Sequence, residues 1–169
     1  GGILAGQSLI RASELRAVTT EYQRYVAATQ TFRNKYFALP GDITNATKFW
    51  GTQGACPGDS TTPYTTAATC DGDGDGRVEG LGFGVTNSNE MYTFFQHLAN
   101  AGLIEGRYTG VSGGAVNTYS STAGTNVPRS KLGNSGWTAI YSGIIAGDAW
   151  SFAGDYGHAL WFVGQATSN

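Results

Sequence analysis

The stretch RASELRAVTTEYQRYVAATQTFRNKY, residues 11–36, decides the fold. It contains no glycine or proline, and its larger apolar residues recur every three or four positions. This spacing places them on one stripe of an α-helix, with the charged and amide residues largely outside the stripe. We therefore predict one long amphipathic helix, whose stripe consists of Leu15, Val18, Tyr22, Tyr25, Phe32 and Tyr36, with Thr29 in the remaining position.

The segment before this helix, GGILAGQSLI at residues 1–10, carries no charge. Counted from Ile3 to Tyr36, the helix is about 50 Å long at 1.5 Å per residue. A globule of this chain length has a radius of gyration of only about 15 Å, so one end of the helix must protrude. The charge-free end is the candidate, and we interpret it as the downstream half of a membrane segment. The alternative is an ordinary amphipathic helix that breaks near Gly6.

The chain after Tyr36 predicts a head that begins with helix and ends with sheet. The motif LPGD at residues 39–42 ends the long helix, and Asp42 is placed to cap a short helix over residues 43–50. A further helix begins near Glu90, capped from residues 87–89, and ends at Gly102. The β-rich runs at residues 137–141, 149–152 and 158–163 indicate an antiparallel meander. The predicted class is α+β, with a long helix over residues 1–36 and a head with long loops over residues 37–169.

The composition excludes several classes of protein. The 169 residues suffice for one core, and the formal net charge is −2, without the basic excess of most nucleic-acid-binding domains. Only 13% of the residues are charged, and 26 are glycine, which is typical of a neutral, loop-rich surface. The aromatic content of 12% argues against disorder.

The two cysteines, Cys56 and Cys70, lie 14 positions apart in a loop rich in Gly, Thr and Pro. Their spacing matches no metal or redox motif, and two unrelated free thiols are the alternative. We predict a disulfide that closes the loop, and therefore an oxidising compartment such as the periplasm or the cell exterior.

The run DGDGDGRVE at residues 71–79 matches the first nine positions of a calcium-binding loop. Calcium takes six to eight oxygen ligands, and glycines let alternate carboxylates converge. The predicted ligands are Asp71, Asp73, Asp75, the backbone carbonyl of Arg77, and Glu79. The twelfth position, normally a bidentate glutamate, is Gly82, so Glu79 or a carboxylate from elsewhere, with Glu90 the nearest, must substitute. A solvated Gly/Asp turn cluster is the alternative.

The sequence predicts no enzymatic activity. The pentapeptide GVSGG at residues 110–114 fits the G-x-S-x-G pattern of hydrolases, and an aspartate and His158 follow it in the hydrolase order. However, a polar Ser/Thr-rich stretch follows Ser112 where a hydrolase has a helix, and alternating βα units are not visible.

Two groups of motifs carry a resemblance to a known family. The charge-free start leads into one long helix, which is followed by ALPGDITNA at residues 38–46 and FWG at residues 49–51. This arrangement resembles the prepilin-type family, which comprises type IV pilins and the pseudopilins of type II secretion. The runs QHLANAGLI at residues 96–104 and GRYTG at residues 106–110 resemble a recurring segment of one bacterial subgroup. Together these matches cover roughly residues 1–110.

The resemblance implies a structural subunit of an extracellular or periplasmic bacterial filament. Its N-terminal helix, residues 3–36 here, would lie in the inner membrane before assembly and self-associate in the filament core afterwards. The resemblance places the processing site upstream of Gly1 and implies no nucleic-acid partner and no small-molecule substrate. Pseudopilins have calcium-stabilised heads, which supports calcium here. The rival interpretation is a calcium-dependent adhesin or sugar-binding head that uses the loops at residues 107–136 and exposed tryptophans.

Overall fold

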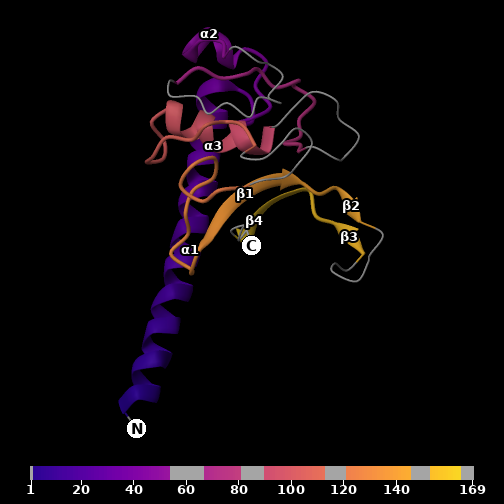
Figure 1. Ribbon diagram of the computed structural model, residues 1–169. Helices are drawn as coiled ribbons and strands as arrows, with labels where there is room; N and C mark the ends of the chain where they lie inside the picture. The colour runs from indigo at the N-terminus through magenta and orange to yellow at the C-terminus, as the bar shows by residue number, and fades with distance from the viewer. Residues whose placement is uncertain (1, 54–66, 81–89, 113–120, 146–152, 165–169) are drawn as a thin grey trace.

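The computed structural model describes residues 2–53, 67–80, 90–112, 121–145 and 153–164. Within these ranges the chain forms three helices and four short strands (Figure 1). The fold is α+β, with a long N-terminal helix and antiparallel strands, as predicted. The described strands form two separate pairs, and β1 lies directly beside β4, so the predicted meander is wrong. The elements are α1 Gly2–Tyr36, α2 Ala46–Trp50, α3 Glu90–Asn100, β1 Ser135–Tyr141, β2 Ile144–Ile145, β3 Gly154–Asp155 and β4 His158–Gly164.

Helix α1 is continuous from Gly2 to Tyr36, so the predicted long helix is confirmed and there is no break at Gly6. Four threonines in its interior direct their hydroxyls back to the carbonyl four residues earlier, which satisfies these polar side chains along the helix. The helix ends where Phe37 adopts a left-handed conformation, with φ of 56°, and donates its N–H to the Arg33 carbonyl.

One face of α1 contributes to the core of the head. Tyr25, Ala28 and Phe32 are buried, and the Tyr25 ring lies 5.3 Å from that of Phe95 and 5.8 Å from that of Trp137. The predicted apolar stripe is therefore divided, because Leu15 and Tyr22 are exposed. The C-terminal half of α1 belongs to the same core as α3 and β1.

The head contains two antiparallel strand pairs, β1 with β4 and β2 with β3. In the larger pair, Ser135 lies opposite Gly164 and Tyr141 opposite His158. The strands predicted at residues 137–141 and 158–163 are confirmed, whereas residues 149–152 lie outside the described residues. Gly154 and Asp155, which lie between two of the predicted runs, form β3, and the chain turns at Gly157, which has a φ of 54°.

One carboxylate on α1 joins the helix to the sheet side of the head. Glu21 accepts hydrogen bonds from the Ser130 hydroxyl at 2.7 Å, from the Lys131 backbone N–H at 2.9 Å and from the Trp137 indole N–H at 2.8 Å. Two of these donors lie just before β1 and the third lies on it. The glutamate therefore fixes the position of the sheet along the helix.

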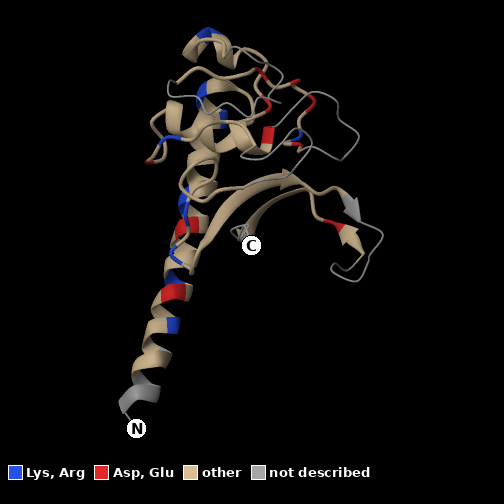
Figure 2. Ribbon diagram, viewed as in Figure 1, with Lys and Arg blue, Asp and Glu red and all other residues tan. Residues whose placement is uncertain are grey.

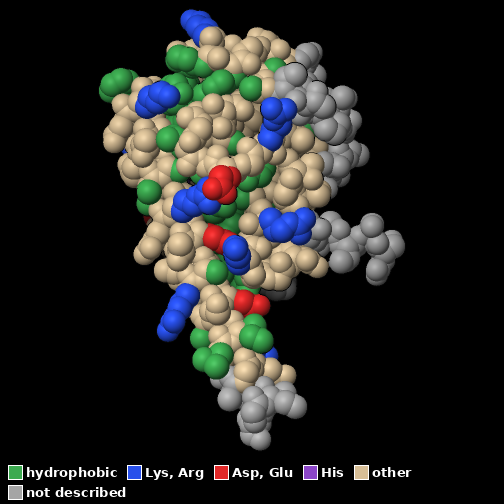
Figure 3. All heavy atoms as spheres, turned by 90° about the vertical axis from the view of Figure 1, so that its left-hand side faces the viewer, with side chains coloured by type: hydrophobic (Ala, Val, Ile, Leu, Met, Phe, Trp, Pro, Cys, Tyr) green, Lys and Arg blue, Asp and Glu red, His purple; other side chains and the backbone are tan. Residues whose placement is uncertain are grey.

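The N-terminal part of α1 extends away from the head (Figure 1), and apolar side chains lie uncovered on it (Figure 3). Leu9 is 71% exposed, Ile10 61% and Leu15 62%. Among the helices of the described residues, none has the length and apolar character needed to cross a membrane.

Candidate metal centre

The acidic loop, residues 71–79, crosses directly over the segment that follows α1. The Gly72 N–H donates to the Ile43 carbonyl at 2.9 Å. A Cβ on Gly72 would overlap the backbone of Gly41 and Asp42, so only glycine permits this close crossing. Cys70, just before the loop, is disulfide-bonded. The only other cysteine in the chain, Cys56, lies outside the described residues.

The crossing brings five carboxylates together in two overlapping triads. One triad is Asp42, Asp73 and Asp75, and the other is Asp73, Glu79 and Glu90, with Asp73 shared. In each triad the ligand oxygens lie within 4.8 Å of one another. Acidic positions accordingly gather in the head between the loop and the start of α3 (Figure 2). A set of donors made only of carboxylate oxygens suits a hard cation such as Ca²⁺ or Mg²⁺.

Buried carboxylate oxygens in both triads lack a hydrogen-bond donor. Asp42 Oδ1 and Glu79 Oε2 have no partner among the described residues, although Asp42 is only 4% exposed and Glu79 only 7% exposed. A buried carboxylate oxygen without a donor or cation is destabilising, because its hydration has been removed and nothing has replaced it. These two atoms are therefore positions where a cation would supply the missing interaction.

Backbone N–H groups hold the other carboxylate oxygens in place. Glu90, in the first turn of α3, accepts from the backbone N–H of Asp73 at 3.1 Å and of Glu79 at 3.2 Å. Asp42 Oδ2 accepts from the Gly76 N–H at 3.1 Å. These bonds orient the triads before any cation arrives, and the N-terminus of α3 favours the negative charge on Glu90.

The buried carboxyls resist ionisation. The pKa of Asp42 is raised to about 6, chiefly by burial, with a smaller contribution from the neighbouring Asp75 and Asp73; backbone hydrogen bonds from Gly76 and Gly74 partly oppose this rise. Burial likewise raises the pKa of Glu90 to about 7. Burial and the same two aspartates raise the pKa of Glu79. A divalent cation between the carboxylates would offset both desolvation and mutual repulsion.

The structure brings together three of the five predicted ligand residues, Asp73, Asp75 and Glu79. It adds Glu90, the substitute considered from the sequence, and Asp42, which sequence reasoning missed. The Arg77 side chain lies over the Tyr141 ring, 4.9 Å from its centroid, and its Nε is 3.9 Å from Asp75 Oδ2. The predicted role of the Arg77 carbonyl as a ligand stays a prediction.

Asp71 is in neither triad. Its two carboxylate oxygens accept hydrogen bonds from the Thr47 backbone N–H at 2.8 Å and from the Thr47 hydroxyl at 3.0 Å. The prediction that Asp42 caps a helix starting at residue 43 is wrong. The helix α2 begins at Ala46, its N-cap residue Asn45 makes no side-chain capping bond, and Asp71 supplies the acceptor from a distant part of the chain.

The two histidines have structural partners. His97 is fully buried, where its Nδ1 accepts from the Gly41 N–H at 3.0 Å and its Nε2 lies 2.8 Å from the Thr69 hydroxyl. His158 Nε2 accepts from the Val78 N–H at 3.1 Å, which uses the ring nitrogen that a hydrolase would need as its base.

Comparison of this chain with known protein families, with curated protein sequences and with solved structures finds no match.

Proposed function

We propose that this chain is a structural subunit of an extracellular or periplasmic filament, assembled through α1, with a head stabilised by calcium. The observation that carries the proposal is the part of α1 that projects beyond the head with Leu9, Ile10 and Leu15 largely exposed. Burying one such side chain stabilises by about 1.5–3 kcal/mol, so covering all three is a substantial driving force.

Self-association explains how a projecting helix persists. Short helices without tertiary packing are marginal in water, and the N-terminal part of α1 extends away from the described part of the head. Packing between copies supplies the missing contacts. When the surfaces that meet are different on the two copies, the contact repeats and produces an open helical polymer.

Calcium fits the head better than magnesium does. Five carboxylates from three separate segments offer more oxygens than the one or two carboxylates typical of a magnesium site. A bound Ca²⁺ would connect Asp42 after α1, the loop at residues 73–79 and Glu90 on α3. It would thereby stabilise the loop-rich part of the head.

A type IV pilus subunit and a type II secretion pseudopilin both fit this description. They differ in abundance, because a major pilin makes up most of its filament and a pseudopilin belongs to a secretion machine. Quantitative mass spectrometry of sheared surface filaments distinguishes them. A dominant share for this chain supports the pilin, and its retention in the cell envelope supports the pseudopilin.

One observation favours the adhesin alternative. Trp161 on β4 is 48% exposed and its neighbour Phe162 is 41% exposed, and exposed aromatic rings are common in sugar-binding sites. Binding of the protein to a glycan array, lost in the Trp161→Ala variant, would support a sugar-binding head.

The assembly proposal is tested by replacing Leu9, Ile10 and Leu15 together with serine and measuring the size of the protein by sedimentation velocity. We expect the native chain to form large assemblies and the triple variant to remain monomeric. Leu132→Ser is the matched control, because Leu132 is also exposed, at 36%, but lies on the head. Equal assembly of the triple variant and the native chain would contradict the proposal.

A further inference from the structure

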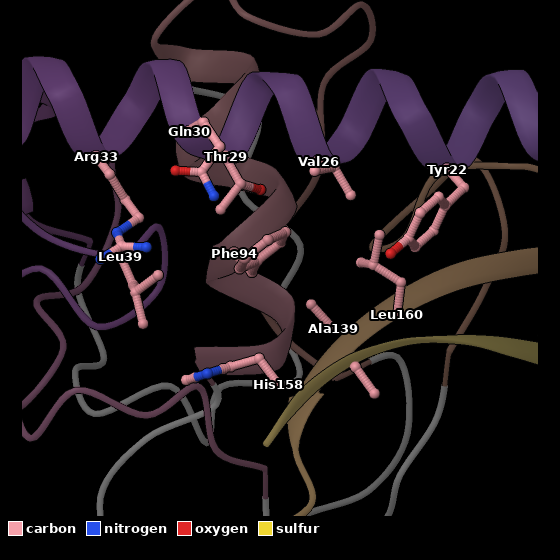
Figure 4. Close-up of a pocket in the computed structure, with 11 residues that line it drawn as sticks. Tyr22, Val26, Thr29, Gln30, Arg33, Leu39, Phe94, Ala139, His158 and Leu160 are labelled. Atoms are coloured by element: carbon pink, nitrogen blue, oxygen red, sulfur yellow. The ribbon is translucent and has the colours of Figure 1, made fainter. Parts of the chain in front are cut away.

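A groove runs between α1 and the sheet of the head (Figure 4). Its volume is about 490 Å³. Tyr22, Val26 and Arg33 line it from one side of α1, with Tyr22 and Arg33 at opposite ends, and Phe94 and Leu160 form much of the opposite wall. The middle of the groove is lined mainly by apolar side chains, together with Thr29 and Gln30, and Arg33 places a cation at one end.

The cation at the end of the groove is the guanidinium of Arg33, which has no acidic partner among the described residues. The nearby His158 does not add charge, because burial, and to a lesser degree Arg33 itself, lower the pKa of its imidazole. A partner that presents an apolar side chain beside a carboxylate would therefore bind the groove more tightly, because it matches both the apolar lining and the positive charge.

The projecting part of α1 presents such a pair. Ile10 and Glu14 are four positions apart and so share one face of the helix. At 100° per residue this face continues the one that carries Ala28 and Phe32 into the core, but this part of the helix extends away from the described part of the head. Ile10 is 61% exposed, and Glu14 has no salt bridge or hydrogen bond to the described residues.

We propose that the groove between α1 and β4 receives the projecting end of α1 from a second copy of this chain, with Ile10 in the apolar middle and Glu14 opposite Arg33. This inference rests on the proposed filament function and names the contact that builds the filament. The groove and the helix end are different surfaces, so the contact is heterologous and leaves both partner surfaces free for further copies.

The pairing also fixes the offset between neighbours. Glu14 and Arg33 are 19 positions apart, so parallel copies are displaced by about 28 Å along the helix at 1.5 Å per residue. In the same register Ile10 of one copy lies beside Thr29 of the next, which lines the groove.

Charge reversal tests the contact in the whole chain. Glu14→Arg and Arg33→Glu, made singly, place like charges opposite each other and should raise the concentration needed for assembly by about tenfold or more. The double variant restores an opposite pair and should assemble within about threefold of the native chain. Arg16→Glu is the matched control, since Arg16 is exposed on the opposite side of the helix.

Sedimentation velocity over a concentration series gives the assembly threshold, and thermal unfolding of each variant shows whether the head is intact. Weaker assembly of both single variants, with assembly restored in the double variant, supports the contact. If the native chain and all variants assemble equally, or if the double variant fails to recover while its head remains folded, the groove contact is wrong and the filament proposal stands. A native chain that stays monomeric would overturn both.

Discussion

Asp71 and Asp73 lie two positions apart in one loop, yet their carboxylates have different surroundings. Asp73 belongs to both triads, whereas Asp71 accepts two hydrogen bonds from Thr47. We predict that saturating Ca²⁺ raises the free energy of unfolding of the native chain by about 2.7 kcal/mol at a hundredfold excess over Kd. Asp73→Asn should abolish this gain, measured as the difference in melting temperature between calcium and EDTA.

Asp71→Asn is the matched control for that experiment. It should retain the calcium-dependent gain while lowering the stability in both buffers by about 0.5–1.5 kcal/mol, because asparagine keeps one acceptor oxygen for Thr47 and loses the other. If the two variants respond equally to calcium, the assignment of the cation to the triads is contradicted.

His97 makes the stability depend on pH. Burial lowers the pKa of its imidazole from 6.5 to about 3, so the unfolded chain binds more protons below pH 6.5 and the folded state loses stability as the pH falls. His97→Gln removes this titration. We predict that the stability advantage of the native chain over the variant shrinks by about 2 kcal/mol between pH 7 and pH 5. Urea unfolding at constant calcium measures it, and a constant difference would refute the prediction.

Asp42 shows why the site was only partly predictable from the sequence. The spacing of residues 73–79 indicates convergent carboxylates, and the missing ligand at Gly82 indicates that others must come from elsewhere. The crossing that delivers Asp42 depends on contact between Gly72 and the segment at residues 41–43, which no local pattern encodes. The only sequence signal for this crossing was Gly72 between two aspartates, and a glycine next to aspartate is common in loops.

The attachment of α1 to β1 depends on Glu21. Its carboxylate satisfies the buried indole N–H of Trp137, the Ser130 hydroxyl and the Lys131 backbone N–H. We predict that Glu21→Ala lowers the free energy of unfolding by about 1–3 kcal/mol, because these donors lose their partner. Chemical denaturation measures the change. Glu105→Ala is the control, since Glu105 forms an exposed pair with Arg24 at 3.8 Å, and exposed pairs contribute at most about 1 kcal/mol. Equal losses in both variants would contradict this role for Glu21.

The end of α1 is strained at Phe37, a residue with φ of 56° that is 93% exposed. A residue other than glycine in this conformation destabilises the folded state by about 1–2 kcal/mol. Replacing it with glycine removes this cost, but glycine also increases the entropy of the unfolded chain, which cancels part of the gain in stability. We predict that Phe37→Gly stabilises the protein by about 0.5–1 kcal/mol, measured by thermal unfolding. Phe49→Gly is the control with the opposite sign, because Phe49 is an exposed phenylalanine inside α2. Destabilisation by Phe37→Gly would show that the ring has a structural role.

Across the whole molecule, elements with strong local patterns were predictable and those made by distant contacts were not. The apolar spacing of residues 11–36 identified α1, the start and stop signals near Glu90 and at Gly102 identified α3, and β-rich runs identified β1 and β4. The spacing did not reveal that Leu15 and Tyr22 lie outside the core, because the head covers only one face of the helix and only part of its length. How far a head extends along a helix depends on long-range contacts such as those of Glu21.

Copies of this chain are proposed to form a filament through the part of α1 that projects beyond the head. Immunogold electron microscopy of surface filaments, with an antibody raised against the head, tests this claim most directly. We predict gold particles along the whole length of the filaments, and none on filaments from cells that carry the triple serine replacement of Leu9, Ile10 and Leu15. Unlabelled filaments, with the chain recovered only as a monomer, would contradict the account.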